Sequence, residues 1–596
     1  MSVLDRIERL RNVMEQQKID CYIIPTDDYH HSEYVGDYFK FREYITGFTG
    51  SAGTAVFTKD KAGLWTDGRY FIQAEAQLKG SGITLYKSGE SDVPTIEEFL
   101  KSELKEGDVL GFDGRTVTYA QGKRYCHIAD ENGASLKYSL DFAQNIWKER
   151  PEMSMESVFS LADEYTGEKI GSKLERIREI MKENGCNAHV LSSLDDIAWL
   201  LNIRGNDIAY CPLVLSYAIV YNNSVELFAD TRKFSDDIIN LLAENQVKIY
   251  PYEDIYRKVS EMTSEDKLLL DSTIMNYSLY QSISKETVIV DKQNPEILMK
   301  SVKNETQAEN LRKAHLKDAV AHTKFMYWLK KNIGRVEITE LSASARLEGL
   351  RAEQEHFLGP SFGPISAYGE HGAIVHYSAD EKSNVPLKEG KLFMTDTGGH
   401  YLEGSTDITR TVALGEVGNI EKEHFTLVAR AMLRLANTVF LYGCSGANLD
   451  CIAREVFWKE GLNFNHGTGH GVGYLLNIHE GPINFRWKEG ERPAPALEEN
   501  MVITDEPGIY IEGSHGIRLE NELLVRKTVK NEYGQFMNFE ILTYVPIDLD
   551  AILPEKMSTE EKEMLNHYHK QVYEKVSPYL SEEERIWLKE YTRAVK

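Results

Sequence analysis

The sequence predicts an α/β protein of three domains, in which two related α/β domains precede a larger α+β domain. Three observations lead to this prediction. The chain has 596 residues, which is too long for a single hydrophobic core. Its first half contains an internal repeat, and its second half opens on a long helical pattern followed by β-rich runs. We therefore expect domains at residues 1–155, 156–297 and 298–596.

The internal repeat begins at Arg6 and again at Lys173. The segments RIERLRNVMEQQKIDCYIIPTDD and KLERIREIMKENGCNAHVLSSLDD align at an offset of 167 residues, which pairs Asp28 with Asp195. Each segment reads as an amphipathic helix followed by a β-rich run, CYIIP or AHVLSS. Further predicted strands are GTAVFT and GLWTDG in the first copy, and SYAIVYN and SVELFA in the second. The segment KERPEMSMES links the two copies.

The third domain begins with KSVKNETQAENLRKAHLKDAVAHTKFMYWLKKNI, where apolar residues at helical spacing predict a long helix. The β-rich runs that follow alternate with one more predicted helix, EKEHFTLVARAMLRLANTVFL. From about residue 555 to residue 596 the chain reads as charged helix with aromatic residues at intervals. We expect this tail to pack either on its own domain or on a partner subunit.

Composition and charge narrow the classes of function. Hydrophobic residues make up 42% of the chain and charged residues 27%, as in ordinary globular proteins. The formal net charge is −25 and there is no long Lys/Arg run, which argues against a nucleic-acid partner. Six cysteines without a CxxC pair predict reduced thiols. The first residues lack the apolar core of a signal peptide, and no 18-residue apolar run occurs, so we expect a cytoplasmic protein without a membrane partner.

Four acidic residues and one histidine of the third domain lie in or beside apolar, β-rich runs. They are Asp396 in KLFMTDTGG, Asp407 in GSTDITRT, His470 in HGTGHGVG, Glu506 in MVITDEPGIY and Glu520 in IRLENELLV. Buried carboxylates are costly unless they are paired or bind a metal, so four of them need a shared explanation. Two divalent cations would neutralise four carboxylates. Oxygen ligands with a single imidazole suit Mn²⁺ or a similar ion.

The spacing of these residues is consistent with one site. Asp396 and Asp407 are 11 residues apart across HYLEG, and Glu506 and Glu520 are 14 residues apart. Each pair therefore fits two antiparallel strands joined by a short connection. His470 lies in a glycine-dense segment that we expect to be a loop, where small neighbours allow backbone and substrate to approach closely.

These segments resemble the pita-bread metallopeptidases, the family that includes methionine aminopeptidase, prolidase, creatinase and aminopeptidase P. The order Asp, Asp, His, Glu, Glu is the family's order of ligands to two metal ions, and all five positions hold the expected residue type. The motifs DxG…DxTRT, HGTGHGVG, HEGP, EPGIY and RxEN are most similar to the three-domain cytosolic form of Xaa-Pro aminopeptidase. The resemblance covers essentially the whole chain.

The resemblance implies a pita-bread catalytic domain that hydrolyses the bond between an N-terminal residue and a following proline. It implies that Asp396 binds one metal ion, that Asp407 and Glu520 bridge two, and that His470 and Glu506 bind the other. Mn²⁺ is the expected metal, and Co²⁺ and Zn²⁺ accept the same ligands. A hydroxide between two metals is a nucleophile at neutral pH, and Glu506 would carry its proton to the leaving nitrogen. The family also implies a homodimer.

Further residues match family positions near the substrate. The resemblance implies that His376, in GAIVHY, and His479, in NIHEGP, are catalytic and line the substrate cleft together with His466, in NHGTGH. The alternative for each is a histidine that holds loops together. Arg518 either contacts ligands and substrate or supports them from behind. Arg69, in LWTDGRYF, either reaches the cleft from a neighbouring unit or forms a plain salt bridge.

Two other functions stay open at this point. A prolidase-type dipeptidase would share the metal ligands, but the second N-terminal domain disfavours it. A non-catalytic pita-bread protein that binds peptides or histones would be marked by lost ligands, and all five are present here. Because a fold alone does not fix a function, the prediction of an enzyme depends on the complete ligand set. Its expected substrates are peptides with proline at the second position.

Overall fold

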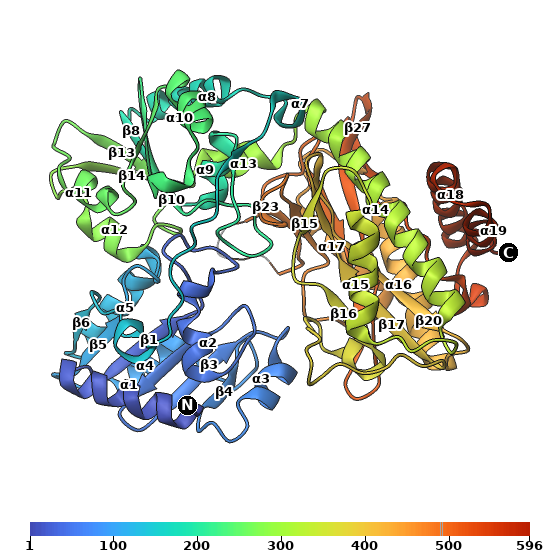
Figure 1. Ribbon diagram of the computed structural model, residues 1–596, viewed down its shortest axis with the longest axis horizontal. Helices are drawn as coiled ribbons and strands as arrows, with labels where there is room; N and C mark the ends of the chain where they lie inside the picture. Colours follow the sequence, from blue (N-terminus) through green and yellow to red (C-terminus); the bar gives the residue numbers. More distant parts are fainter. Residues whose placement is uncertain (489, 491–492) are drawn as a thin grey trace. The chain divides into compact units, whose positions relative to one another are not determined.

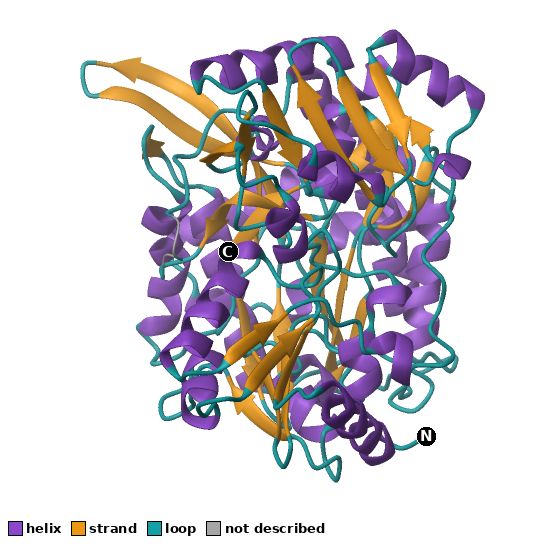
Figure 2. Cartoon of the chain, turned by 90° about the vertical axis from the view of Figure 1, so that its left-hand side faces the viewer, coloured by secondary structure: helices purple, strands orange, loops and turns teal. Residues whose placement is uncertain are grey.

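The computed structural model describes residues 1–488, 490 and 493–596. The chain forms two compact units, one of residues 1–161 and 168–297 and the other of residues 162–167 and 298–596. Helices flank the strands in both units (Figures 1 and 2). Within the described residues, no helix has both the length and the apolar composition needed to cross a bilayer. Each unit is described by itself.

The first unit contains two six-stranded sheets with the same topology (Figure 1). Their orders are β4-β3-β2-β1-β5-β6 and β12-β11-β10-β8-β13-β14. In each sheet the three central strands are antiparallel and the outer strands join in parallel. The strands are β1 (Cys21–Pro25), β2 (Thr54–Thr58), β3 (Ala62–Thr66), β4 (Thr84–Lys87), β5 (Val109–Phe112), β6 (Ser135–Lys137), β8 (Ala188–Leu191), β10 (Ser216–Tyr221), β11 (Val225–Ala229), β12 (Val247–Tyr250), β13 (Lys267–Leu270) and β14 (Val288–Asp291).

The shared topology confirms the prediction of two related α/β domains in the first half of the chain, while the exact boundaries at residues 155 and 297 stay predictions. Helices α1 (Val3–Gln17) and α8 (Ile170–Glu183) open the two copies. Each buries one apolar stripe, as expected of a helix that packs on a sheet. The predicted offset of 167 residues relates the buried side chains directly: Ile7 to Leu174, Leu10 to Ile177 and Met14 to Met181.

In the second unit, short sheets and long helices pack around a large hydrophobic core, with a smaller cluster beside Met394. The strands that carry the predicted site belong to sheets β16-β17-β20 and β21-β28-β27-β24-β22-β23. The flanking helices are α14 (Glu305–Asn332), α15 (Glu340–Ala352), α16 (Asn419–Ala436) and α17 (Gly446–Trp458), of which α14 packs on α15 and α16 on α17. The long predicted helix is thus confirmed as α14, whose N-terminus is capped by Asn304.

The prediction of only one further helix between this long helix and the tail was wrong, because α15 and α17 are also present. The sequence of α15, ELSASARLEGLRA, buries the polar Glu340 and Arg351 along with its apolar residues, which obscures its helical period. Helix α17 begins at Gly446. That glycine is required by packing, since a Cβ there would lie 1.7 Å from the carbonyl oxygen of Asn484.

The C-terminal tail packs on its own domain, which was one of the two expectations. Its helices are α18 (Thr559–Val576) and α19 (Glu582–Tyr591). Leu565, Val572 and Leu588 of the tail belong to the same buried core as the interior face of α16. Glu561 of α18 accepts hydrogen bonds from two arginines of α16 at 3.0 and 2.8 Å. The tail is therefore an integral part of the second unit.

Candidate metal centre

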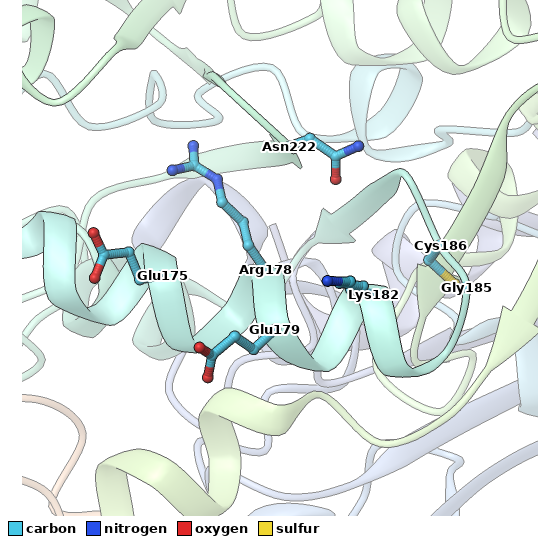
Figure 3. Close-up of a pocket in the computed structure, with 7 residues that line it drawn as sticks. All are labelled: Glu175, Arg178, Glu179, Lys182, Gly185, Cys186 and Asn222. Atoms are coloured by element: carbon cyan, nitrogen blue, oxygen red, sulfur yellow. The ribbon is translucent and has the colours of Figure 1, made fainter.

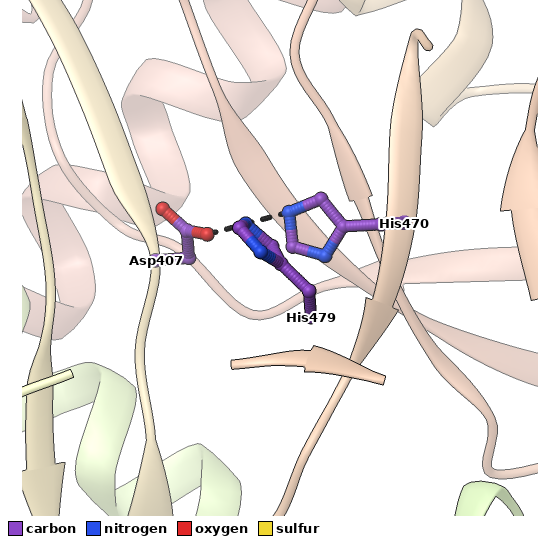
Figure 4. A group of neighbouring side chains, drawn as sticks. All are labelled: Asp407, His470 and His479. Carbon is purple, nitrogen blue, oxygen red and sulfur yellow. Dashed lines mark ion pairs between the residues drawn. The ribbon is translucent and has the colours of Figure 1, made fainter. Parts of the chain in front are cut away.

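The five predicted ligands converge in the second unit. Donor atoms of Asp396, Asp407 and Glu520 all lie within 4.8 Å of one another, and so do those of His470, Glu506 and Glu520. Asp407 and His470 also form a group with His479, which we had placed at the substrate (Figure 4). Asp407, His470 and Glu520 each belong to two of these three groups.

Antiparallel strand pairs place the carboxylates, as the spacing predicted. Asp396 lies in β17 (Lys391–Thr397), opposite Thr409 of β20 (Ile408–Leu414), and Asp407 directly precedes β20. Glu506 directly follows β24 (Val502–Asp505), and Glu520 directly precedes β27 (Asn521–Asn531), which pairs with β24. The residues between them form the small hairpin of β25 (Gly508–Ile511) and β26 (His515–Arg518).

His470 lies in a strand, β22 (Gly469–Val472), and the expectation of a loop was wrong. The glycines on either side serve close strand packing: a Cβ at Gly469 would lie 1.9 Å from the carbonyl oxygen of Thr504. His470 Nδ1 donates to the carbonyl oxygen of Gly471 at 2.9 Å, since a carbonyl can only accept. Nε2 therefore faces the carboxylates, 3.5 Å from Asp407 and 3.5 Å from Glu506.

Burial dominates the electrostatics of this cluster. It raises the pKa of Glu520 well above the usual value, and the charges of Asp407 and Glu506 raise it further. Burial also raises the pKa of Asp396, against the effect of Arg518, and the pKa of Glu506, against the effect of His470. For His470, burial alone would lower the pKa, but Asp407 and Glu506 raise it to about 9. Bound protons or cations are thus needed to balance the negative charge of the buried carboxylates.

Two supporting residues escaped the sequence analysis. Thr409 Oγ1 donates to Glu520 Oε2 at 2.7 Å, which orients that carboxylate. The backbone N–H of Asp407 donates to Glu522 Oε1 at 2.7 Å, and Glu522 Oε2 lies 3.0 Å from His315 Nε2 of α14. Both residues stand inside the motifs DITRT and RLENELL, but nothing in the sequence pattern shows which ligand each one contacts.

Arg518 and His466 are joined through Tyr510, a third residue that we had not predicted. Arg518 Nη2 forms an ion pair with Asp396, and its Nη1 donates to Tyr510 Oη at 2.7 Å. Tyr510 Oη lies 2.8 Å from His466 Nε2, while His466 Nδ1 donates to the carbonyl oxygen of Gly467 at 2.7 Å. These contacts favour a supporting role for Arg518 and His466, behind the metal ligands.

His479 and His376 also lie at or near the cluster. His479 is the first residue of β23 (His479–Phe485), and its ring centroid lies 4.3 Å from that of His470, with the ring planes nearly perpendicular (Figure 4). His376 lies in the turn after the 3₁₀ helix η3 (Gly369–Ala373). Arg518 Nη2 approaches the carbonyl oxygen of the preceding Val375 at 3.4 Å, which ties this turn to the cluster.

Arg69 lies in the first unit, where Asp67 holds its guanidinium through two hydrogen bonds of 2.8 Å. The same clamp of an aspartate and an arginine two residues later recurs twice in this unit, as Asp113 with Arg115 and Asp230 with Arg232. The last of these follows β11, the counterpart of β3. The geometry of Arg69 is therefore a recurring feature of strand ends, which favours the salt-bridge interpretation.

A separate cavity of about 500 Å³ lies on α8 in the first unit (Figure 3). Charged side chains of both signs line it, and so does Cys186, whose thiol pKa is raised by burial. It contains none of the predicted site residues. The lining residues are Glu175, Arg178, Glu179, Lys182, Gly185, Cys186 and Asn222.

The known protein families that match this chain follow one another in the same order as the domains of the fold. Residues 6–137 and 149–307 each match the creatinase/prolidase N-terminal domain. Residues 309–527 match metallopeptidase family M24, and residues 535–595 match the C-terminal region of that family. All five predicted ligands thus fall within the M24 match.

Similar proteins span almost the whole chain. Xaa-Pro aminopeptidase 1 of Dictyostelium discoideum is 36% identical over 97% of this chain and 94% of its own length. Aminopeptidase P1 of Arabidopsis thaliana is 34% identical over 99% of both chains. The crystal structure of X-prolyl aminopeptidase from Caenorhabditis elegans, described as a cytosolic enzyme with a di-nuclear active site, is 33% identical and superimposes with a TM-score of 0.95 over 100% of both chains. The chain belongs to metallopeptidase family M24, among its Xaa-Pro aminopeptidases.

Proposed function

We propose that this chain is a metal-dependent aminopeptidase that hydrolyses the bond between an N-terminal residue and a following proline. The observation that carries the proposal is the convergence of four carboxylates and one imidazole of a β-rich core. Similarity over the full length to the Dictyostelium and C. elegans enzymes supports the substrate class.

We propose that two divalent cations, Mn²⁺ in the first place, bind between these side chains. The donor set fits: Asp396 Oδ1 is buried and accepts no hydrogen bond within the described part of the chain, and His470 presents Nε2 to the carboxylates. Asp407 and Glu520 are the bridging ligands, because each belongs to two of the three groups of donors and a carboxylate has two oxygens to offer. His470 also belongs to two groups, but its Nδ1 donates to Gly471, which leaves only Nε2 for one ion. When bound, such ions supply a water of lowered pKa and polarise the scissile carbonyl.

The remaining steps fall to side chains of this protein. Glu506, whose Oε1 lies 3.2 Å from Thr504 Oγ1, accepts the proton of the attacking water and transfers it to the leaving nitrogen. That proton is needed because the nitrogen leaves as a neutral amine only when it is protonated, and a prolyl nitrogen acquires its first N–H in this step. In this proposal, His479 and His376 donate to the oxygen on which negative charge develops.

The two alternatives are supported less well. The Xaa-Pro dipeptidase of Bacillus anthracis shares the fold, with a TM-score of 0.51, but it is 24% identical and covers 64% of this chain. A purely peptide-binding protein would have no need for a complete ligand set. We further propose that the protein acts in the cytosol as a homodimer, a state that sedimentation analysis would measure.

Cleavage of matched peptides tests this function. With added Mn²⁺, we expect release of arginine from Arg-Pro-Pro and none from Arg-Ala-Ala, and we expect Arg-Pro-Pro to be cleaved faster than the dipeptide Arg-Pro. Faster cleavage of Arg-Pro would indicate a dipeptidase. A protein that binds Mn²⁺ and leaves all three peptides intact would contradict the proposal.

Replacement of Arg69 by alanine tests whether this residue contributes to substrate binding. If it contacts the substrate, KM for Arg-Pro-Pro is expected to rise on the order of tenfold, because a hydrogen bond to a charged group is lost. The bound metal should stay at the parental amount. Arg232→Ala removes the same clamp at the matching strand end and serves as the control. Kinetics of Arg69→Ala equal to the parent would remove Arg69 from the site.

A further inference from the structure

Arg410, in the motif DITRT, is fully buried, yet no carboxylate of the described chain is paired with it. Oxygen atoms of neutral groups surround its guanidinium instead. Nη1 donates to the carbonyl oxygens of Glu520, at 2.5 Å, and Thr409, at 2.8 Å. Nη2 donates to Asn521 Oδ1 at 2.8 Å and to the carbonyl oxygen of Val545 at 2.9 Å. A buried cation of this kind depends on each of its acceptors.

The remaining acceptor comes from the C-terminal tail. Tyr568 lies on α18, and its Oη accepts a hydrogen bond of 2.7 Å from Arg410 Nη2. The same hydroxyl donates to the carbonyl oxygen of Val545 at 2.6 Å. Its side chain is 1% exposed, and α18 packs against α14 and α16 (Figure 1). The hydroxyl is therefore fixed on both sides.

We propose that Tyr568 positions the metal ligand Glu520 through Arg410. The C-terminal tail would then contribute to the affinity of the site for metal ions. Arg410 Nη1 holds the carbonyl oxygens of Glu520 and Thr409 together, while Thr409 Oγ1 orients the Glu520 carboxylate at 2.7 Å. The planar guanidinium thus joins strand β20 to the backbone of Glu520, the residue that directly precedes β27 and carries the metal-binding carboxylate. This inference rests on the proposed function, because it assumes that Glu520 binds a metal ion.

Tyr568→Phe is the variant that tests this positioning role. It keeps the ring in the core and removes only the hydroxyl, so that Arg410 Nη2 keeps two of its three acceptors and loses the one that the tail supplies. Partners behind metal ligands typically contribute 10–100-fold to metal affinity, and Tyr568 stands one step further out. We therefore expect Mn²⁺ to bind about tenfold more weakly, as measured by calorimetric titration of the full-length protein. Activity at limiting Mn²⁺ should fall and should recover at saturating Mn²⁺.

Tyr573→Phe provides the matched control on the same helix. Tyr573 is partly buried against the same core, and its hydroxyl makes no hydrogen bond within the described residues. Its Mn²⁺ dissociation constant is expected to equal that of the parent. Melting temperatures of all variants separate stability from affinity: a lower melting temperature of Tyr568→Phe with an unchanged Mn²⁺ dissociation constant would overturn the inference.

Arg410→Lys supplies a second variant, which keeps the charge and loses the planar fork. We expect it to weaken Mn²⁺ binding more than Tyr568→Phe does, and if it does not fold, Tyr568→Phe decides alone. Different results would contradict the proposed function and the positioning role of Tyr568. A parent protein that binds no Mn²⁺ or does not cleave Arg-Pro-Pro would contradict the proposed function. A parent that does both, beside a Tyr568→Phe variant of equal Mn²⁺ affinity, would contradict the positioning role only.

Discussion

Replacing Asp407 by asparagine is expected to abolish hydrolysis of Arg-Pro-Pro and to reduce the amount of bound Mn²⁺. Asp407 is shared by two of the three donor groups and is 3% exposed, so the substitution removes a charged ligand from both groups and solvent is poorly placed to replace it. Activation of water and polarisation of a carbonyl by metals contribute several kcal/mol to catalysis, which corresponds to a loss of about a thousandfold or more. The fold should persist, because asparagine keeps the shape of the side chain, and the backbone N–H still donates to Glu522.

Metal analysis and kcat/KM, measured on the same preparations, check this prediction. Asp548→Asn offers the matched control, because Asp548 is also a buried aspartate of the catalytic domain and accepts a hydrogen bond from the backbone N–H of Ala413. It should lower the melting temperature and leave metal content unchanged. If Asp407→Asn kept the parental rate with both ions bound, Asp407 would not be a ligand.

Two features of this protein could be predicted from the sequence. One is the repeated domain, and the other is the set of carboxylates whose burial costs free energy unless a cation compensates their charge. The domain repeat was visible because the same helix face is buried in both copies, so Leu10 and Ile177 occupy equivalent positions at the expected offset. The metal ligands were visible because acidic residues within apolar strands need compensation. Both signals lie in the pattern of short segments, and neither requires knowledge of which distant segments are in contact.

The parts that could not be predicted depend on contacts between distant segments. Arg410 and Tyr568 are 158 residues apart, and the contact of Asp407 with Glu522 spans 115 residues. Around His470, glycine led to the wrong expectation of a loop for a physical reason. Glycine there marks close packing of backbones, as Gly446 does at the start of α17, and the sequence pattern of such packing is the same as that of a loop.

Removing the metal ions with a chelator is expected to abolish activity and to lower the melting temperature, by more at about pH 8 than at about pH 6. In the metal-free protein, burial raises the pKa values of Asp396, Glu506 and Glu520, and the neighbouring carboxylates raise that of His470 to about 9. A group whose pKa is raised by folding binds protons more tightly in the folded state. Its stabilising contribution is complete below its unfolded pKa and is lost as the pH rises through the folded pKa. The metal-free protein should therefore lose stability from about pH 5 to about pH 9.

Bound cations take the place of those protons, so the stability of the metal-loaded protein should not fall in this way as the pH rises. Binding of one ion at a concentration of 1,000 times its Kd stabilises the folded state by about 4 kcal/mol, and each ion displaces protons from its ligands. The difference in melting temperature between loaded and chelated protein should thus widen as the pH rises. Scanning calorimetry at three pH values measures this difference, and Asp407→Asn, which carries one buried charge fewer, should show a smaller widening. A difference that stays constant or narrows toward high pH would mean that the buried carboxylates and His470 are not the groups that the cations neutralise.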